Sequence, residues 1–334
     1  MSTQTLARAV VWKGPQQIAV EDRPPMASVA PDKIVVRVES IGVCGTDVSL
    51  WRGDDSRIVP ETVIGHEFGG TIVATGARVT GWTIGQSVAV DPNLVCGTCS
   101  ECATGSRGRC PQRQLMGIDT DGGLQNYVTI DPESAILVPG TPDPRALALV
   151  EPIAVGVHAC SRAGVTAGAS LGIIGGGAIG MACALQAQSL GASSVTVVEP
   201  DAARRATIET YGVTALAPGD APSGSWDVAI DTVGQGSTIT VAMDLVKQGS
   251  TICVVGLAHG GTLPPATELV RRELTITGTF CYTAGDLHTA AGLVSRHGLG
   301  ALPVDIVHGL IPVPGAIENI ARGHLGRGKT VIIP

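Results

Sequence analysis

The chain has 334 residues, of which 44% are hydrophobic and 15% charged, and it contains 45 glycines. This composition predicts a folded, turn-rich protein, and the length favours two domains. The net charge of −7 and the lack of a basic run argue against nucleic acid or an anionic membrane as the main partner. A small-molecule ligand is therefore expected.

The N-terminal sequence MSTQTLARAV lacks the apolar core of a secretion signal. We therefore expect a cytoplasmic protein whose thiols stay reduced. Residues 165–198 carry no charge and could be taken for a membrane span, but their glutamines and small residues favour a strand, a turn and a helix.

The first 150 residues contain short β-type segments separated by glycine and proline, with few helical periods between them. This pattern predicts an all-β, barrel-like first half. The expected strands are residues 33–40, 69–76, 86–92 and 125–131.

The second half changes character after the prolines of residues 138–144. Apolar strands alternate there with helix-length segments such as AIGMACALQAQSLG, which is typical of a doubly wound parallel sheet. From residue 283 onward we expect one helix and a final strand, KTVIIP. The strands expected in the parallel sheet are residues 170–175, 194–199, 226–231, 250–256 and 274–279.

Four cysteines, Cys96, Cys99, Cys102 and Cys110, lie within fifteen residues. Four thiolates on one short loop match a closed tetrahedral zinc site, whose role is structural. Reduced surface thiols are one alternative, although clustered thiols without a metal are prone to oxidation. An iron–sulfur cluster is another, but its usual cysteine spacings differ.

A second group of metal-binding residue types lies upstream, in CGTD and GHEFGG. Cys44 and His66 supply a thiolate and an imidazole, and a catalytic zinc site needs a third protein ligand plus an open position. Glu67 and Glu151 are the candidates. A cysteine and a histidine 22 residues apart are weak evidence alone, because a buried cysteine is commonly just a small apolar residue.

The segment GIIGGGAIG follows an apolar strand and begins a helix. Glycines in the order G-x-G-x-x-G permit a tight turn, close approach to a pyrophosphate and close helix packing, and the helix N-terminus donates N–H groups to the anion. The residues expected to bind a dinucleotide here are Gly175, Gly177, Ala178, Ile179 and Gly180.

Glu199 lies 19 residues past Gly180, at the end of an expected strand, where its carboxylate suits an adenosine ribose. That charge would repel a 2′-phosphate, so NAD is favoured over NADP, although Arg204 and Arg205 act in the opposite direction. We expect these two arginines to lie on a solvated helix face, with one guanidinium, that of Arg204, against the adenine of the cofactor. Asp231 and Gly256 end two further strands at the edge where ligands of such sheets bind, but both also suit ordinary turns.

The motifs CGTD, GHEFGG, the four-cysteine loop, EPIAVGVHA, the glycine-rich turn and KTVII occur in this order along the chain. In this combination the chain resembles the zinc-dependent medium-chain alcohol dehydrogenases, in their polyol (sorbitol- or butanediol-type) branch. The resemblance implies an α/β protein with a GroES-like β-barrel catalytic domain over residues 1–155, including a zinc lobe at about 92–112. A Rossmann domain would follow over 156–290, and 291–334 would return to the catalytic domain.

The resemblance also implies roles at the open metal site. Cys44 and His66 would be zinc ligands. Either Glu67 or Glu151 would be the carboxylate ligand, while the other holds the zinc-bound water. Asp47 is similar to the carboxylate that orients the ligating imidazole, and Thr46 to the hydroxyl that takes the alcohol proton. Ser49 stands where many relatives have a histidine that completes the proton relay, so here the relay would end at water.

The implied reaction is the reversible oxidation of a secondary alcohol with NAD, using one catalytic and one structural zinc per chain. The resemblance further implies a homodimer or homotetramer. Sorbitol-type relatives have an arginine where this chain has Cys281, which makes a smaller diol or a less polar alcohol credible. Alternatives are a threonine- or sugar-1-dehydrogenase-like member, and a zinc-free quinone reductase or non-enzymatic nucleotide-binding protein of the same fold.

Overall fold

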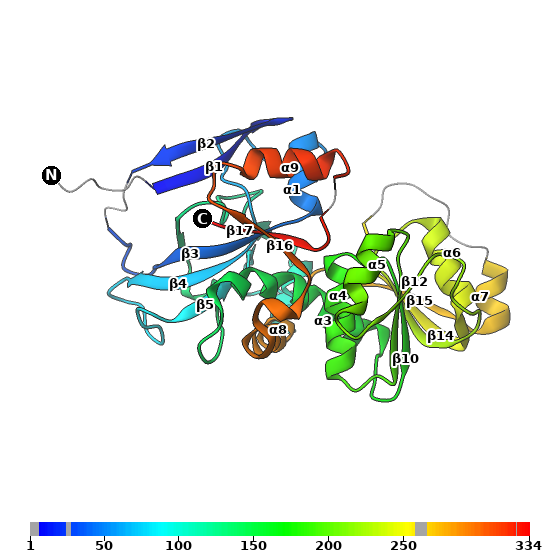
Figure 1. Cartoon of the computed structure of the whole chain (residues 1–334). Coiled ribbons are helices and arrows are strands. Elements are labelled where there is room, and N and C mark those ends of the chain that lie inside the picture. Colours follow the sequence, from blue (N-terminus) through cyan, green and yellow to red (C-terminus); the bar gives the residue numbers. More distant parts are fainter. Residues whose placement is uncertain (1–6, 25–27, 258–265, 325) are drawn as a thin grey trace. The chain divides into compact units, whose positions relative to one another are not determined.

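The computed structural model in Figure 1 describes residues 7–24, 28–257, 266–324 and 326–334. The chain forms two compact units. Unit 1 comprises Met1–Glu151 and Leu287–Pro334, and unit 2 comprises Pro152–Asp286. Helices α3 (Val150–Ala163) and α8 (Ala284–His297) carry the chain across the two boundaries.

Unit 1 is built mainly from β-strands, as the sequence predicts. Strands β1 (Ala7–Gly14) and β2 (Gln17–Arg23) form a hairpin. A seven-stranded sheet has the order β16-β17-β3-β4-β5-β9, with β8 also paired to β3. Its strands are β16 (Val304–His308), β17 (Lys329–Ile333), β3 (Ile34–Val43), β4 (Glu67–Thr75), β5 (Ser87–Val90), β9 (Ala135–Leu137) and β8 (Tyr127–Ile130).

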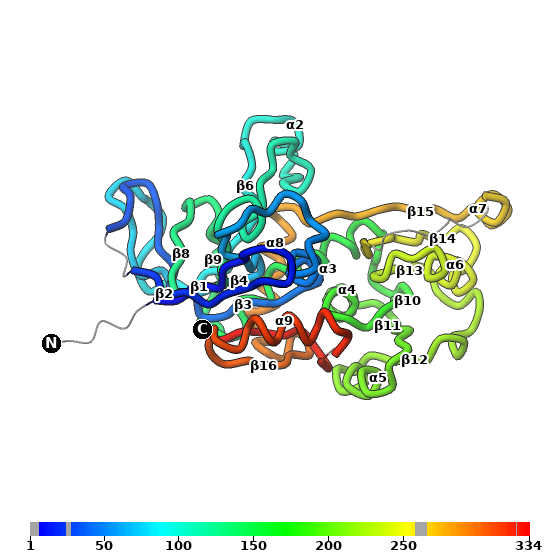
Figure 2. Tube along the Cα trace, turned by 90° about the horizontal axis from the view of Figure 1, so that it is seen from above, coloured from blue at the N-terminus to red at the C-terminus, as the bar shows by residue number. Residues whose placement is uncertain are grey.

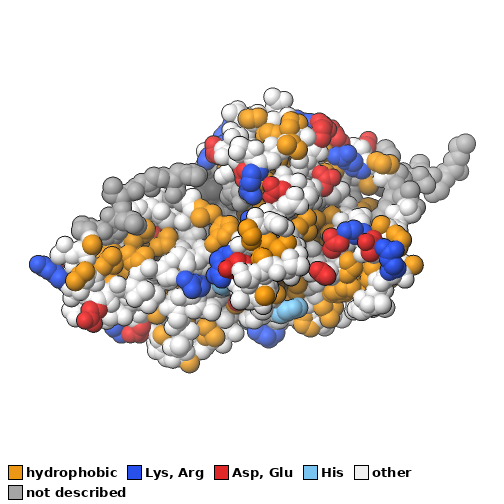
Figure 3. All heavy atoms as spheres, turned by 180° about the vertical axis from the view of Figure 1, so that it is seen from behind, with side chains coloured by type: hydrophobic (Ala, Val, Ile, Leu, Met, Phe, Trp, Pro, Cys, Tyr) orange, Lys and Arg blue, Asp and Glu red, His pale blue; other side chains and the backbone are white. Residues whose placement is uncertain are grey.

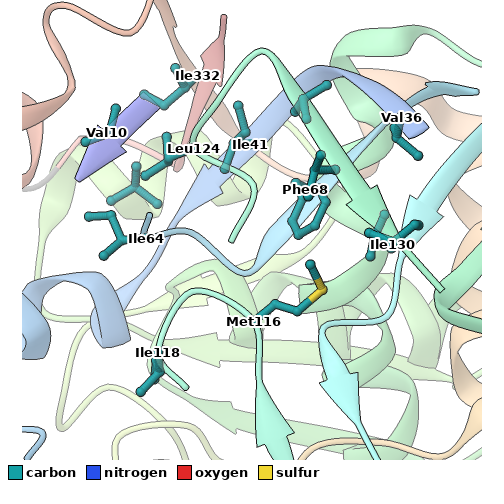
Figure 4. Packing of buried hydrophobic residues seen from close by; sticks show 14 of the residues in the cluster. Val10, Val36, Ile41, Ile64, Phe68, Met116, Ile118, Leu124, Ile130 and Ile332 are labelled. Carbon is teal, nitrogen blue, oxygen red and sulfur yellow. The ribbon is translucent and has the colours of Figure 1, made fainter. Parts of the chain in front are cut away.

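The core of unit 1 lies on the inner face of this sheet (Figure 4). Ile41 of β3 is paired in register with Phe68 of β4 on one side and with Ile332 of β17 on the other, and all three are buried. Cross-strand apolar neighbours of this kind specify register, because a slip by one residue would turn every side chain to the opposite face.

Unit 2 is a six-stranded parallel sheet with the order β12-β11-β10-β13-β14-β15. Counted from β10, this is the 3-2-1-4-5-6 order of a Rossmann sheet, which confirms the predicted doubly wound fold. The strands are β10 (Ser170–Ile174), β11 (Ser194–Val198), β12 (Thr214–Leu216), β13 (Trp226–Asp231), β14 (Val246–Val254) and β15 (Thr275–Gly278).

Helices cover both faces of this parallel sheet. Figure 1 shows α4 and α5 on one face and α6 and α7 on the other. Right-handed crossovers between parallel strands produce this arrangement when the chain reverses direction from one half of the sheet to the other. The helices are α4 (Ala178–Ser189), α5 (Ala202–Glu209), α6 (Gly236–Leu245) and α7 (Ala266–Arg272).

The C-terminal segment contains more structure than the sequence predicts. Between α8 and β17 lie strand β16 and helix α9 (Val313–Ala321). Pro314 and Gly315 obscure the helical pattern of α9, but proline is tolerated in the first turn of a helix, where its missing N–H is not needed. Helix α9 packs against α1 (Gly45–Arg52), and Arg52 donates a hydrogen bond of 2.7 Å to the carbonyl of Ala321.

Residues 165–198 fold as β10, α4 and β11, as predicted. Within the described ranges, one helical stretch, Pro144–Ala163, is long and apolar enough to cross a membrane, but 72% of its apolar window is buried inside the protein. This burial is typical of a core helix.

On the face seen in Figure 3, Lys and Arg side chains lie scattered among Asp and Glu side chains.

Gly172 in β10 tests the packing of unit 2. A Cβ added there would lie 1.7 Å from Cε3 of Trp226 in β13, so an alanine must displace a buried indole. We expect Gly172→Ala to lower the free energy of unfolding by about 1–3 kcal/mol, measured by urea denaturation. Gly278→Ala is the control, because its Cβ would meet no atom within 4 Å in the part of the chain that the structure describes. Equal stability of the two variants would contradict this packing.

Candidate metal and nucleotide sites

The four predicted cysteines meet on one loop of unit 1. Strands β6 (Asn93–Leu94) and β7 (Gln114–Leu115) pair at its base, and the short helix α2 (Ser100–Ala103) lies within it. Figure 2 shows the α2 loop extending from the rest of this unit. An ion pair of 2.6 Å between Arg109 and Glu101 ties the two halves of the loop together.

The sulfur atoms of this loop have the spacing of a tetrahedral metal site. Cys99 and Cys102 are 3.5 Å apart, Cys96 and Cys110 3.6 Å, and Cys96 and Cys102 3.9 Å. Zinc–sulfur bonds of about 2.3 Å in a tetrahedron require sulfur atoms about 3.8 Å apart. The four sulfurs therefore fit around one zinc ion.

The protonation of the thiols in the loop supports a cation there. Backbone N–H groups of Thr98 and Cys99 lower the pKa of Cys96 to about 6, so this thiol is ionised near neutral pH. Burial and the neighbouring Cys99 raise the pKa of Cys102 to about 12. A thiolate at one cysteine disfavours ionisation of the next, because the two negative charges repel each other. A divalent metal compensates these charges and takes the place of the thiol protons.

The second site begins where β3 ends. Cys44 is the N-cap of α1, and its sulfur accepts a hydrogen bond of 3.2 Å from the N–H of Thr46. Asp47 closes the cap from the other side, since its Oδ2 accepts 2.9 Å from the N–H of Cys44. The CGTD motif is thus a capping box with cysteine in the usual place of serine, and the carboxylate lies favourably near the helix N-terminus.

His66 faces Cys44 because of strand register. Gly42 in β3 lies opposite Glu67 in β4, so the residues just after β3 and just before β4 come together. Gly65 turns the chain with a φ of +91°, a conformation that favours glycine. The resulting distance from Cys44 Sγ to His66 Nε2 is 3.3 Å, close to the roughly 3.6 Å that two ligands of a tetrahedral zinc require.

The charges around His66 also suit a cation. Burial lowers the pKa of His66, but the acidic groups of Cys44, Asp47 and Glu67 outweigh this effect and raise it well above its usual value. Burial raises the pKa of Asp47. Among the residues that the structure describes, Asp47 Oδ1 and His66 Nδ1 are buried without a hydrogen-bond partner. A divalent ion would compensate this excess of buried acidic groups.

The structure brings some of the predicted ligands together and leaves others apart. Within the described part of the chain, two groups of ligand atoms lie within 4.8 Å of one another, the four cysteines of the loop and the set Cys44, Asp47 and His66. Glu67 and Glu151 belong to neither group. Glu67 instead forms a buried ion pair with Lys329, with 2.6 Å between Lys329 Nζ and Glu67 Oε1.

The two hydroxyl residues predicted for the proton path lie on α1. Thr46 and Ser49 are three residues apart, so they share one face of this helix, and both are half-buried.

The glycine-rich turn of unit 2 joins β10 to α4. Gly175 has a φ of +96°, and a Cβ at Gly180 would lie 2.0 Å from the carbonyl oxygen of Gly175. A Cβ at Gly177, the N-cap of α4, would meet no atom of the described residues within 4 Å. These glycines produce a tight turn and close helix packing, the geometry that dinucleotide-binding loops require, and Ala178 and Ile179 form the first turn of α4.

Glu199 is almost fully buried behind this turn. Its Oε2 accepts a hydrogen bond of 2.9 Å from the N–H of Gly176, and its Oε1 accepts one of 3.0 Å from the N–H of Asp201. Arg204 Nη1 lies 3.5 Å from Glu199 Oε2. Glu199 therefore shapes the glycine turn itself, a role that the sequence analysis did not predict.

Asp231 and Gly256 lie at the carboxyl edge of the same sheet. Asp231 accepts hydrogen bonds from the N–H groups of Val233 and Gly234 and from the hydroxyl of Thr238. A Cβ at Gly256 would lie 2.1 Å from the backbone of Val233, so two loop backbones touch here. The side chain of Asp231 is thus used within its own turn.

Comparison with known proteins agrees with this geometry. Residues 30–140 match the family described as alcohol dehydrogenase GroES-like domain, and residues 178–296 match the zinc-binding dehydrogenase family. The chain belongs to the zinc-binding dehydrogenases, as its 32% identity over 308 residues with one relative also shows. The family that the sequence motifs predict is therefore confirmed, and the protein is an oxidoreductase.

That relative is the 2-dehydro-3-deoxy-L-galactonate 5-dehydrogenase of Pseudoalteromonas atlantica, and the alignment covers 88% of this chain and 90% of the relative. D-xylulose reductase A of Aspergillus niger is 28% identical, with 99% of each chain covered. A structure described as a zinc-binding dehydrogenase from Sinorhizobium meliloti, bound to NADP, is 31% identical. It superposes with a TM-score of 0.90, covering 99% of this chain and 100% of the other.

Lys329 is the residue that sequence reasoning missed. It begins the strand KTVII, where a lysine looks like an ordinary charged residue at a strand end. Nothing local distinguishes it, because its partner Glu67 is 262 positions away in the sequence.

Replacement of a loop cysteine tests the four-sulfur site. We expect Cys110→Ser to lower the zinc content of the purified protein by about one ion per chain, measured by atomic emission, because a closed site depends on all four ligands. The melting temperature should fall as well. Cys253→Ala, which removes a buried thiol outside both ligand groups, should leave the zinc content unchanged. An unchanged zinc content in Cys110→Ser would contradict the assignment.

Proposed function

We propose that this protein is a zinc- and NAD-dependent dehydrogenase that interconverts a secondary alcohol of a polyol or diol and the corresponding ketone. The approach of Cys44 Sγ to His66 Nε2, 3.3 Å apart in a buried acidic site, is the observation that carries this proposal. The donors of the metal lie in unit 1, and the glycine-rich turn for the dinucleotide lies in unit 2.

A zinc ion at this site would supply Lewis acidity that makes a bound alcohol hydroxyl acidic near neutral pH. Cys44 and His66 would hold it, with Glu151 or Glu67 as the carboxylate ligand. Asp47 holds Cys44 in place through the helix cap. Its carboxylate also lies within 4.8 Å of the imidazole of His66, whose orientation it would help to fix. Thr46 would accept the alcohol proton and pass it outward.

Ser49 makes the end of this proton path different from that of many relatives. A serine hydroxyl can relay a proton by rotation, but it cannot act as a base near pH 7. With Thr46 and Ser49 on one face of α1, the proton would pass to water beyond Ser49.

The names of the relatives support a polyhydroxylated substrate. One relative is a D-xylulose reductase and another is the 5-dehydrogenase of a deoxy sugar acid. Cys281 stands where sorbitol-type relatives carry an arginine, which favours a shorter or less polar alcohol. Tyr282, next to it, is buried. Turnover with a panel of vicinal diols, pentitols and hexitols would identify the substrate class.

The assignment of NAD is also a proposal. Glu199 places a carboxylate beside the glycine turn, and a carboxylate repels a 2′-phosphate. Arg204 lies against this carboxylate, where it partly offsets the charge. The Sinorhizobium structure is bound to NADP, so the preference of this protein between NAD and NADP has to be measured.

The remaining features complete the proposal. The four-cysteine loop would hold a second, structural zinc, and nine free thiols are consistent with a cytoplasmic location.

Strand β15 forms one edge of the parallel sheet, and we propose a homodimer or homotetramer that joins such edges. A monomer in light scattering would contradict this assembly.

Cys44→Ser tests the catalytic metal. We expect kcat/KM to fall by at least about a hundredfold. Loss of a residue that only supports a metal ligand typically lowers activity by about 10–100-fold, and loss of the ligand itself should lower it further. Circular dichroism should show a folded protein, since serine can still cap α1. Cys253→Ala serves as the matched control for loss of a thiol. Full turnover with bound zinc in Cys44→Ser would refute the proposed centre.

Comparison of kcat/KM for NAD and NADP tests the cofactor. We expect NAD to be preferred by at least about tenfold, because a like charge beside the 2′-phosphate is costly. Glu199→Gln should lower the ratio of kcat/KM for NAD to kcat/KM for NADP. The glutamine can still accept the hydrogen bond from the N–H of Gly176, but it carries no charge. A preference of the wild-type protein for NADP would overturn this part of the proposal.

A further inference from the structure

A buried serine in β3 connects this strand to the segment that leads to Glu151. The 3₁₀ helix η3 (Pro144–Leu149) comes directly before α3, and Glu151 is the second residue of α3. The hydroxyl of Ser40 donates a hydrogen bond of 2.9 Å to the carbonyl of Pro144 and accepts one of 3.0 Å from the N–H of Ala148. One side chain thus binds the first and the fifth residue of η3.

These two hydrogen bonds lie where water cannot replace them. Ser40 and Ala148 are both fully buried. A buried N–H or carbonyl group that loses its partner carries the full cost of its desolvation, so both bonds strongly favour the observed position of η3. A hydroxyl suits this place because it donates and accepts at the same time.

A glycine in β4 holds η3 from a second side. Gly69 is the register partner of Ser40. A Cβ at Gly69 would lie only 2.6 Å from the Cβ of Leu147, which is fully buried in η3. The helix is therefore held on β3 by hydrogen bonds and on β4 by close packing.

This contact lies close in the sequence to the candidate metal ligands of unit 1. Ser40 precedes Cys44 by four residues, and Gly69 follows His66 by three. Glu151 lies two residues beyond the end of η3 and belongs to the same unit. The contact of η3 with the two strands therefore determines how closely Glu151 can approach the other two ligands.

We propose that Ser40 is a positioning residue whose hydroxyl holds η3 on β3 and so sets the distance of the Glu151 carboxylate from Cys44 and His66. The inference rests on the proposed zinc site, with Glu151 as its carboxylate. A strand of the central sheet is a rigid support for such an anchor. A misplacement of about 1 Å at a reacting group can lower a rate by about a hundredfold, so the anchor matters for function.

A purely structural role for Ser40 predicts a different pattern. In that case its hydrogen bonds contribute only to the stability of unit 1, and any effect of their loss is independent of Glu151. If Ser40 acts through Glu151, loss of the hydroxyl changes the metal site only while the carboxylate is present. The two roles therefore differ in whether the effects of the two substitutions add.

A double-mutant cycle with Ser40→Ala and Glu151→Gln tests the proposal. We would record the visible d–d spectrum of the Co²⁺ protein and subtract that of Cys44→Ser to isolate this site. Metal release to a chelator would be measured as the kinetic phase that Cys44→Ser lacks. Each single variant should change the band pattern and release the metal about tenfold faster than the wild type.

The double variant gives the decisive result. Ser40→Ala/Glu151→Gln should release the metal no faster than Glu151→Gln alone. A further tenfold increase in the double variant would show that Ser40 acts independently of Glu151 and would overturn the proposal.

Two further variants serve as the control and as a second test. Ser250→Ala removes a buried hydroxyl in unit 2, which donates 3.4 Å to the carbonyl of Trp226, and it should keep the wild-type spectrum and release rate. Ser40→Cys fills the same place with a weaker donor and acceptor, so it keeps the test valid if Ser40→Ala does not fold. It should release the metal faster than the wild type, and this difference should vanish when Glu151→Gln is added. A difference that persists would contradict the role of Ser40.

The failures of the two proposals can be told apart. A folded Ser40→Ala with the wild-type spectrum and release rate, beside a changed Glu151→Gln, would overturn the role of Ser40 alone. A Glu151→Gln variant identical to the wild type would remove Glu151 from the proposed centre, and this inference with it. A wild-type protein whose cobalt spectrum equals that of Cys44→Ser would remove the metal centre itself.

Discussion

The register of three adjacent strands, β17, β3 and β4, is the constraint on which the candidate metal centre depends. Ile332, Ile41 and Phe68 are paired across these strands and buried together, so the hydrophobic core fixes the register. The same register brings the residue after β3 to the residue before β4. Cys44 and His66 therefore meet as a consequence of the packing of Ile41 and Phe68, which lie three and two residues away from them in the sequence.

Buried charge is the second theme of unit 1. The acidic groups of Cys44, Asp47 and Glu67 lie here together with a histidine and a lysine, in an interior where charges are costly. Within the described ranges, Asp47 Oδ1 and His66 Nδ1 have no hydrogen-bond partner. Buried groups of this kind destabilise the folded protein unless an opposite charge compensates them, and a divalent ion at the proposed site would do so. The four-cysteine loop follows the same logic with thiols, and its sulfur spacing depends on a short loop rather than on the large sheet.

In unit 2, the glycine-rich turn and Glu199 together determine the shape and the charge of the candidate nucleotide site. The parallel sheet presents the N-terminus of α4 at a turn whose glycines allow backbone contact, and Glu199 accepts from that turn's own N–H group. The same carboxylate supports the loop and adds a negative charge beside it, on which the proposed preference for NAD rests. The prediction of a cofactor from Glu199 considered only the second effect, because a hydrogen bond to Gly176 depends on how β11 lies beside β10.

The sequence alone determined the features that depend on near neighbours: the alternation of strands and helices, the four-cysteine loop, the glycine turn and the order of motifs that identifies the family. It also indicated Cys44 and His66, but it could not choose between Glu67 and Glu151 or recognise Lys329. The tertiary structure decided that Glu67 pairs with Lys329 across Gly42, since contact between residues 262 positions apart depends on strand order and register. Local patterns do not encode that order, because it results from the burial of the whole sheet.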